Sequence, residues 1–429
     1  MITMIIKNGY IVDPGNKREG VFDILIQGRK IVSVEKDIKA KDANVIDATG
    51  KIVLPGLIDM HVHLREPGRE NMETVLSGTR AAVAGGVTSV CSMPNTYPAI
   101  DNQKALKELK DIIKKDASSY VFMVGAITVN RGGKVLVDIE KMKAAGAIAL
   151  SDDGSSVHDS AVMASALKKA KENDILIISH CENEELSKGG VVNEGIMATK
   201  LGLKGIPKRA EYEIIERDIM LAKKAKARIH IAHVSTKESV AIIRKAKKEG
   251  ARVTAETAPH YFSLTDTCCE TYDTRTKMNP PLRSKEDLEA IKKGLLDGTI
   301  DAIASDHAPH GKHEKEITFD EAAFGIIGLE TSLALAIMGL AKGEKAPWMK
   351  IAELMSLNPA RILGLKKGAI SEGWDADITI VDPEKEWVYT KESVVSKSKN
   401  SPFLDWQFKG KPTGAIVGGR LVLRDEKFA

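Results

Sequence analysis

Histidines and aspartates stand at the ends of short apolar segments at several widely separated points in this sequence. His61 and His63 are two positions apart in IDMHVHLREPG, and two further apolar segments, ILIISH and RIHIAH, end in histidine. Aspartates follow the same pattern in IALSDDG and IASDHAPH. Imidazole and carboxylate are ligands that suit zinc and related divalent ions. The candidate ligands are His61, His63, Asp153, His180, His233 and Asp306.

Each candidate has an ordinary structural interpretation when it is read alone. His61 and His63 could be two histidines on a partly exposed strand, although their spacing places both imidazoles on one face of that strand. Asp153 and Asp306 could be turn or capping residues, since aspartate favours both positions. The combination favours a metal site, because five separate strand ends would each have to supply a suitable ligand to the same place by accident. Six ligands are also more than one tetrahedral ion needs. Two ions that share a carboxylate would use them all and would activate water strongly.

Short apolar strands alternate with helical segments through the middle of the chain, which is typical of βαβ units. The strand candidates are residues 56–63, 87–95, 120–128, 147–153, 175–180, 228–233, 252–260 and 301–310. Helical patterns cover residues 160–171, 209–226, 237–248 and 285–296. Eight such units over about 300 residues predict an α/β fold, a (β/α)8 barrel of the TIM type, rather than a doubly wound sheet. In such a barrel the carboxyl ends of the strands meet at one mouth, where the candidate ligands would converge.

Both ends of the chain differ from this middle part. Residues 2–55, and the chain from about residue 368, contain short alternating segments broken by turn signals, such as FDILIQGRKIVSVEK and TGAIVGGRLVLRD. We therefore expect the two ends to fold together into one small composite β-sandwich domain. The predicted organisation is a first part of that domain at 1–55, a metal-dependent barrel at 56–365 and the second part of the domain at 366–429.

Composition and charge argue against several other classes of protein. Apolar residues make up 43% and charged residues 28% of the 429 residues, which is ordinary for a globular chain. The 63 basic and 59 acidic side chains are interspersed, so neither nucleic acid nor a membrane is an expected partner. Four cysteines without a CxxC pair fit a reducing cytoplasm. Small molecules are the expected partners.

Motifs for other kinds of catalysis are missing from the sequence. No GxGxxG follows the first strand candidate and no GxxxxGK[ST] occurs, so phosphate loops for nucleotides are not predicted. There is no GxSxG elbow, and Cys181 would face away from its neighbour His180, because adjacent strand residues point to opposite faces. A covalent nucleophile therefore has little support.

Ten short motifs occur in the order typical of the amidohydrolase superfamily. They are DMHVHLREPG, SMPNTYPAIDN, SDDGSSV, SHCEN, HVST, NPPLR, SDHAPH, FGIIGLET, NPARILGL and GWDADITIVD. Over roughly residues 1–425 the chain resembles the dihydroorotase family of that superfamily, in its aspartate-bridged class I type. The resemblance implies two zinc ions per chain. One would be held by His61, His63 and Asp306, the other by His180 and His233, with Asp153 bridging them.

The fourth strand candidate departs from the pattern of much of the superfamily. Hydantoinases, allantoinases and some dihydroorotases carry a carboxylated lysine there as the bridge, whereas AIALSDDG offers no lysine. Asp152 and Asp153 are both available instead. The spacing to His180, which resembles that of the aspartate-bridged type, favours Asp153.

The resemblance also implies how a substrate is held and converted. Its carboxylate would meet Arg65, Asn95 and His310, and its ring amide would meet Asn279 and the backbone of Phe324 and Gly325. An arginine fork can grip a carboxylate through two hydrogen bonds. The implied reaction is the zinc-dependent, reversible cyclisation of N-carbamoyl-L-aspartate to L-dihydroorotate and water in de novo pyrimidine biosynthesis. Asp306 would be the catalytic residue that carries the proton.

Two other interpretations stay open at this point. A hydantoinase or allantoinase would share the barrel and act on similar rings, although the missing lysine and the presence of Arg65 argue against it. A non-catalytic scaffold for aspartate carbamoyltransferase would be expected to lose metal ligands, and all six are present here. For an active enzyme, a homodimer and an association with that transferase are both open as protein partnerships.

Overall fold

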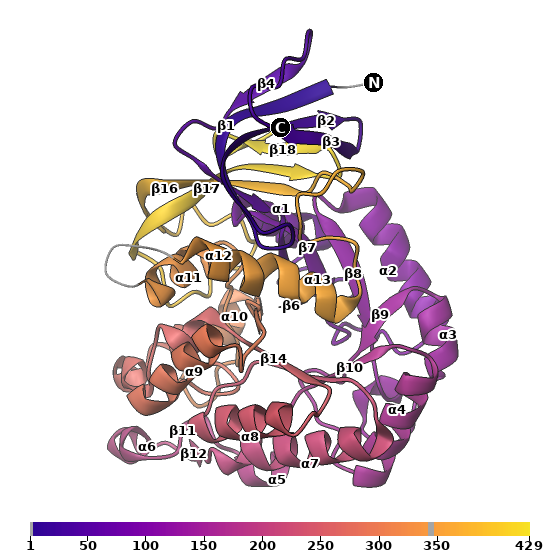
Figure 1. The fold of residues 1–429 in the computed structure, drawn as a ribbon. Helices are drawn as coiled ribbons and strands as arrows, with labels where there is room; N and C mark the ends of the chain where they lie inside the picture. The colour runs from indigo at the N-terminus through magenta and orange to yellow at the C-terminus, as the bar shows by residue number, and fades with distance from the viewer. Residues whose placement is uncertain (1–2, 342–346) are drawn as a thin grey trace.

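Eight parallel strands form the centre of the molecule (Figure 1). The computed structural model describes residues 3–341 and 347–429. The central strands are β6 (Leu57–Val62), β7 (Val87–Ser92), β8 (Tyr120–Gly125), β9 (Ala147–Leu150), β10 (Leu176–Ser179), β13 (Ile229–Ile231), β14 (Val253–Thr257) and β15 (Ala302–Ile303). Each strand pairs in parallel with the next one in this order. Parallel pairing requires that the connection after each strand return the chain to the end of the sheet at which that strand began.

The first and last central strands meet and close the sheet into a barrel. Val62, at the end of β6, forms a parallel bridge with His307, which follows β15. The His63 amide donates a hydrogen bond to the His307 carbonyl at 2.8 Å. The predicted (β/α)8 barrel is therefore confirmed, and its eight strands lie within the eight predicted segments.

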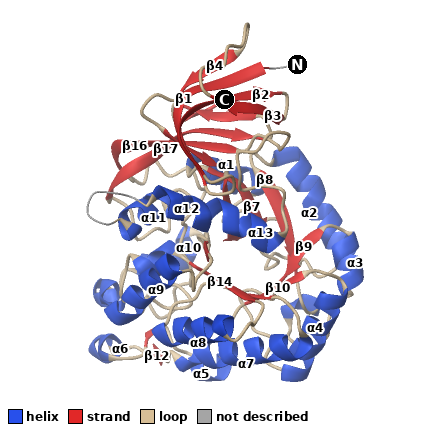
Figure 2. Cartoon of the chain, in the orientation of Figure 1, coloured by secondary structure: helices blue, strands red, loops and turns tan. Residues whose placement is uncertain are grey.

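Helices surround the barrel strands, and a few, such as α6, lie farther from them (Figure 2). They are α1 (Val75–Ala84), α2 (Gln103–Asp116), α3 (Ile139–Ala144), α4 (Ser160–Glu172), α5 (Glu184–Ser187), α6 (Ile196–Leu201), α7 (Arg209–Ala225), α8 (Lys237–Lys248), α9 (Lys285–Asp297), α10 (Lys312–Lys315), α11 (Ser332–Leu340), α12 (Trp348–Ala352) and α13 (Asn358–Leu363). The helix α8 begins after Thr236, whose hydroxyl accepts a hydrogen bond from the Ser239 amide, and its buried side chains recur at helical spacing. Within the described ranges, no helix has the length and apolar character that a membrane span requires.

The two ends of the chain pair with each other in a second sheet, whose indigo and yellow strands lie together in Figure 1. Its strands are β1 (Thr3–Asp13), β2 (Arg18–Gln27), β3 (Lys30–Glu35), β4 (Asn44–Asp47), β5 (Ile52–Pro55), β16 (Ile378–Val388), β17 (Gln407–Val417), β18 (Arg420–Arg424) and β19 (Lys427–Phe428). Antiparallel pairing of β5 with β16 joins the two ends. Ile6, Ile24, Ile378 and Ile416 belong to one hydrophobic cluster, so the small β domain has a core of its own.

The connection between β16 and β17 packs against the barrel. Val394 and Phe403 from this connection belong to the main hydrophobic cluster of the barrel. The buried carboxylate of Glu330 accepts hydrogen bonds from the amides of Val395 and Ser396, at 2.9 and 3.1 Å. Part of the predicted C-terminal segment 366–429 thus contacts the barrel directly, and this contact bears on the active site described below.

Candidate metal centre and active site

The six predicted ligands lie where their strands end, at one mouth of the barrel. His61 is within β6 near its end, and the other five follow β6, β9, β10, β13 and β15. Parallel strands bring these positions together even though they span about 245 residues of sequence. All six residues are buried, with Asp306 the most exposed at 9%. A dense cluster of imidazoles and carboxylates therefore sits in a place that water reaches poorly.

Two overlapping groups within this cluster have the geometry of a metal site. In the first group, Asp306 Oδ1 lies 3.1 Å from His63 Nε2 and 3.6 Å from His61 Nε2. In the second group, Asp153 Oδ1 lies 3.1 Å from His61 Nε2 and 3.6 Å from His233 Nε2. In each group the three potential ligand atoms lie within 4.8 Å of one another. His61 belongs to both groups, so the two candidate ion positions would be neighbours.

His180 lies beside the second group without being part of it. Its Nδ1 is 2.8 Å from His233 Nε2 and 3.4 Å from Asp153 Oδ1. Its Nε2 faces Glu182 Oε2 at 3.3 Å. Five of the six predicted ligands thus fall into three-residue groups, and the sixth is in contact with two of them.

The two neighbouring aspartates after β9 point in different directions. The carboxylate of Asp152 accepts hydrogen bonds from the amides of Ile127 and Thr128, at 2.8 and 3.0 Å. Asp152 therefore holds the loop after β8 in place. Asp153 is the aspartate whose side chain faces the histidines, which is the one favoured by the sequence spacing.

The hydrogen bonds around His61 show that the cluster fits a cation. His61 Nδ1 lies 2.8 Å from the carboxylate of Glu256, a strong acceptor that holds the ring proton on Nδ1. Nε2 then turns a lone pair toward Asp153 Oδ1, and both atoms are buried without a hydrogen-bond partner among the described residues. Two facing electron-rich atoms repel each other unless a proton or a metal ion lies between them. The donor set and its geometry therefore fit a divalent metal ion.

The charges of the cluster also favour a positive charge between His61 and Asp153. Burial alone would lower the pKa of His61, but Asp153, Glu256 and Asp306 outweigh it and raise that pKa well above its usual value. Burial alone would raise the pKa of Asp153, but the surrounding histidines hold it well below its usual value. The carboxylates of the cluster are thus ionised near neutral pH, as metal ligands must be.

Three residues of the mouth have backbones in the left-handed region. The φ angles are 35° at His233, 47° at Asp306 and 61° at Arg65. Such angles cost energy for residues other than glycine and are found in proteins mainly where the surrounding structure enforces them, often at active sites. Here each angle turns a polar side chain at the end of a strand toward the mouth.

Arg65 and His310, predicted to bind the substrate carboxylate, are neighbours. Arg65 Nε donates to the Pro309 carbonyl at 3.0 Å, and its Nη2 lies 3.3 Å from His310 Nε2. Burial and the nearby Arg69 lower the pKa of Arg65 to about 10, so it remains charged at neutral pH. Burial, Arg65 and Lys315 lower the pKa of His310 to about 2, so this ring is neutral.

Asn95, the third residue predicted to bind the substrate carboxylate, contacts His63. Its Oδ1 is 2.7 Å from His63 Nδ1, so the amide accepts the ring proton and leaves His63 Nε2 free for the cluster. The structure therefore gives Asn95 a contact with a candidate metal ligand that the sequence did not indicate. Its amide nitrogen remains available for a substrate carboxylate.

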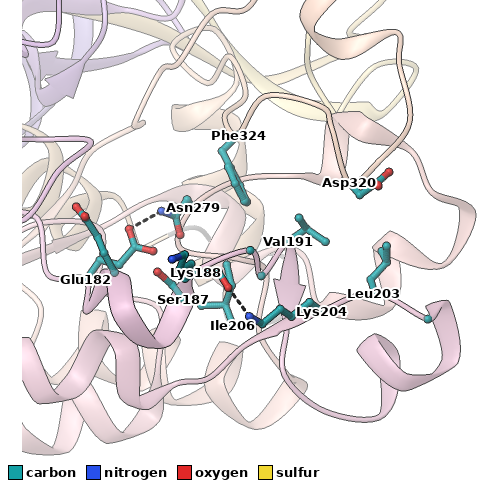
Figure 3. A pocket seen from close by; sticks show the side chains of 14 residues that line it. Glu182, Ser187, Lys188, Val191, Leu203, Lys204, Ile206, Asn279, Asp320 and Phe324 are labelled. Carbon is teal, nitrogen blue, oxygen red and sulfur yellow. Dashed lines mark hydrogen bonds between the residues drawn. The ribbon is translucent and has the colours of Figure 1, made fainter.

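Asn279 and Phe324 line a cavity of about 690 Å³ beside the metal cluster (Figure 3). Asn279 Nδ2 donates to Glu182 Oε2 at 2.8 Å, the same oxygen that faces His180. Gly325 follows with a φ of 127°, and a Cβ there would lie 2.7 Å from Ala308 Cβ and 3.2 Å from His310 Nε2. A residue without a side chain lets this backbone approach the mouth closely.

Two glutamates of the site were not predicted from the sequence. Glu256 lies inside β14, where its 1% exposure marks an unusual charged residue in a barrel interior. Glu182 comes two residues after His180 in SHCEN. Burial opposes ionisation of both, but histidine partners lower each pKa to about 2. A charged residue within an apolar strand was a signal that could have identified Glu256.

The closed barrel, the small β domain from both chain ends and the cluster at the barrel mouth define a hydrolase of the amidohydrolase type. Comparison with known proteins narrows this class. A family model described as dihydro-orotase-like matches residues 50–239. A protein named dihydroorotase from Elusimicrobium minutum is 56% identical, with 98% of each chain covered. Another of that name from Acetivibrio thermocellus is 47% identical, with 99% of each chain covered.

Solved structures with the same fold come from enzymes that act on related rings. L-hydantoinase from Arthrobacter aurescens superimposes with a TM-score of 0.90 at 27% identity, with 100% of this chain and 98% of that chain covered. Dihydropyrimidinase from Brevibacillus agri gives a TM-score of 0.88 at 27% identity, with coverage of 100% and 96%. The chain belongs to the dihydroorotase family, and it is a cyclic amide hydrolase.

Proposed function

We propose that the chain interconverts N-carbamoyl-L-aspartate and L-dihydroorotate, with ring closure as its direction in pyrimidine biosynthesis. The observation that carries this proposal is the position of the Arg65 and His310 pair at the same barrel mouth as the buried His61 and Asp153 cluster. This arrangement supports Arg65 and His310 as an anchor for a carboxylate beside groups suited to amide chemistry. Family membership over nearly the whole chain supports the same substrate pair.

The proposed cofactor is a pair of zinc ions. His61, His63 and Asp306 would hold one ion, and His180 and His233 the other, with Asp153 between them. Such ions supply Lewis-acid polarisation of a carbonyl and lower the pKa of bound water. Glu256 and Asn95 would orient His61 and His63 by accepting their Nδ1 protons, at 2.8 and 2.7 Å.

The chain's own side chains would orient the substrate. The guanidinium of Arg65 is buried and planar, and such a fork grips a carboxylate through two hydrogen bonds. The ring of His310 beside it is uncharged, so it would add a polar contact with the substrate without adding a second positive charge. Asn279 and the backbone at Phe324 and Gly325 would face the ring amide, because they line the adjoining cavity and wall.

Asp306 would transfer the proton between the water and the ring nitrogen during the reaction. Burial opposes its ionisation, but His63, His61 and His233 lower its pKa, so the carboxylate is available as a base. In hydrolysis it would take a proton from the attacking water and deliver it to the ring nitrogen that leaves. In ring closure it would take the proton from the carbamoyl nitrogen and return it to the departing water.

The proposal is tested by following carbamoyl-aspartate cyclisation and dihydroorotate hydrolysis, with metal content measured in parallel. We expect activity in both directions, its loss on treatment with a chelator and its return with zinc. Asp306→Asn should retain the fold and lose at least a hundredfold in kcat. Faster turnover of hydantoin or allantoin than of dihydroorotate would contradict the proposed substrate. Full activity in metal-free protein would contradict the proposed cofactor.

A further inference from the structure

A second cavity, which we call the basic pocket, is lined in part by His310 and Gly311, so it adjoins the proposed substrate site. It has a volume of about 550 Å³, is open to solvent, and is lined by Asn71, the chain after β14, the chain after β15 and the connection between β16 and β17. Its cationic lining residues are Arg275, Lys312, Lys315, Lys391, Lys397 and Lys399. Among the described residues that line it, only Asp273 and Glu316 are acidic.

The two acidic residues leave most of this positive charge uncompensated. Asp273 forms an ion pair with Arg275 at 2.7 Å, and Glu316 pairs with Lys312 at 3.3 Å. The other lysines have no carboxylate within ion-pair distance in the part of the chain that the structure describes. Lys315, Lys397 and Lys399 donate instead to backbone carbonyls. Carbonyl oxygens satisfy hydrogen bonds but do not cancel a positive charge.

The magnitude of the charge excess is large for one cavity. Six cationic and two acidic side chains line the pocket, but burial and Lys277 lower the pKa of Lys315 to about 7, so this lysine is only partly charged near neutral pH. The positive excess therefore lies between three and four charges. Glu330 and Glu73 lie behind Lys399 and offset part of its charge, but both are buried and neither lines the pocket. A concave surface of one sign focuses its field and concentrates ions of opposite charge.

We propose that the basic pocket binds a phosphorylated small molecule of nucleotide size. Lys391, Lys397 and Lys399 together with the partly charged Lys315 exceed the two negative charges of carbamoyl-aspartate, and phosphate groups match such a charge density better than carboxylates do. The volume lies within the range of about 300–1,000 Å³ typical of small-molecule sites. Tyr272 lines the same pocket with 48% of its surface exposed, which offers a flat face on which a base can stack.

One residue connects the basic pocket to the active site. Asn400 lines the pocket, and its Oδ1 accepts a hydrogen bond from the His310 amide at 3.2 Å. Its Nδ2 donates to the carbonyls of Ala308 and Gly325, at 3.0 and 3.1 Å. A ligand that shifts Asn400 would therefore move the segment that positions His310. We expect the bound ligand to change KM for dihydroorotate more than kcat.

The experiment measures binding of ADP, and separately of inorganic phosphate, to the metal-loaded enzyme by isothermal titration calorimetry. Saturating dihydroorotate is present so that the probes cannot occupy the active site. We expect one ADP per chain, with phosphate binding more weakly at the same site. The double variant Lys391→Gln/Lys397→Gln should weaken ADP binding at least tenfold. A double variant on the exposed face of α4, Lys168→Gln/Lys171→Gln, has the same charge change and should bind ADP normally.

Several outcomes would overturn the proposal. They are the lack of saturable ADP binding, displacement of ADP by dihydroorotate, and equal affinity in both double variants. The single variant Lys391→Glu, at an exposed position, gives the same test if the double variant folds poorly. If ADP does not bind but the lysine variants lower kcat/KM for carbamoyl-aspartate in a salt-dependent way, the pocket steers the substrate and the proposal is wrong. The block of the active site by dihydroorotate rests on the proposed function, whereas ADP binding to the chain and its loss in the lysine double variant do not.

Discussion

Replacing Glu256 by Gln should weaken zinc binding about 10- to 100-fold while leaving the fold intact. The Glu256 carboxylate crosses the barrel interior from β14 and accepts the Nδ1 proton of His61, on β6, at 2.8 Å. This contact fixes the tautomer in which His61 Nε2 faces Asp153. Glutamine has the same shape but lacks the charge, and it can present its NH2 group to His61 instead of its oxygen.

The expected magnitude follows from the burial of this contact. Glu256 and His61 are 1% and 0% exposed, so water cannot replace a lost partner. A hydrogen bond to a charged group contributes about 1.5–3 kcal/mol. Since about 1.4 kcal/mol corresponds to a factor of ten in a binding constant, the loss in zinc affinity is about 10- to 100-fold. Glu256→Leu removes the acceptor completely and should lose at least as much.

The measurement is a titration of metal-free protein with zinc in competition with a chromophoric chelator. Asp13→Asn is the matched control, because Asp13 is also a fully buried carboxylate but lies in the small β domain, where it accepts hydrogen bonds from the amides of Gly15 and Ile370. Circular dichroism and thermal unfolding of the metal-free proteins report the fold. If Glu256→Gln is folded and binds zinc as tightly as the control and the wild type, the orientation of His61 does not depend on Glu256 and the reasoning fails.

Three further predictions address the other contacts. Asp153→Asn should lower zinc content and activity, whereas Asp152→Asn should mainly lower the thermal midpoint, because Asp152 bonds to backbone amides; metal analysis with calorimetry separates the two. Arg65→Lys should raise KM about tenfold in steady-state kinetics, since lysine cannot form the two-bonded fork; an unchanged KM would exclude the anchor. Burial raises the pKa of Glu330 to about 7, so the folded state holds its proton more tightly than the unfolded state does. Stability should therefore fall by about 3 kcal/mol as the pH rises from about 4.5 to about 7, and denaturant unfolding should show a flatter dependence in Glu330→Gln.

The barrel could be predicted from the sequence because its strands carry a strong local signal. Short apolar runs rich in β-branched residues alternate with helical patterns, and the predicted helix at 237–248 coincides with α8. The ends of the strands are predicted less accurately than their positions. The predicted segment 301–310 contains only the two-residue strand β15. Beyond it the chain keeps single contacts with its neighbours, from the Ala304 amide to the Thr257 carbonyl and between His307 and Val62, as it forms part of the mouth. Polar residues that follow a strand look like its continuation until the pairing of the neighbouring strand is known.

The meeting of the candidate metal ligands at one barrel mouth could be predicted from the sequence for a topological reason. Once eight parallel strands are expected, their carboxyl ends must meet, and histidines or aspartates at those ends become neighbours without further information. No comparable rule predicts which side chains touch each other across the barrel interior. Glu256 reaches His61 from a strand that is neither its neighbour in sequence nor its partner in the sheet, so only the packed interior reveals the contact.

The connection between β16 and β17 shows what the sequence could not reveal about the substrate end of the site. The pattern of the last 60 or so residues predicts strands of a small β domain, and it gives no sign that part of this segment contacts residues of the barrel mouth. In the structure Asn400, from the same segment, holds the His310 amide and the Gly325 carbonyl together. The proposed carboxylate anchor is therefore complete only when the C-terminal part of the chain has packed on the barrel. A truncation before this connection would remove Asn400 from that anchor even though every candidate metal ligand lies upstream of it.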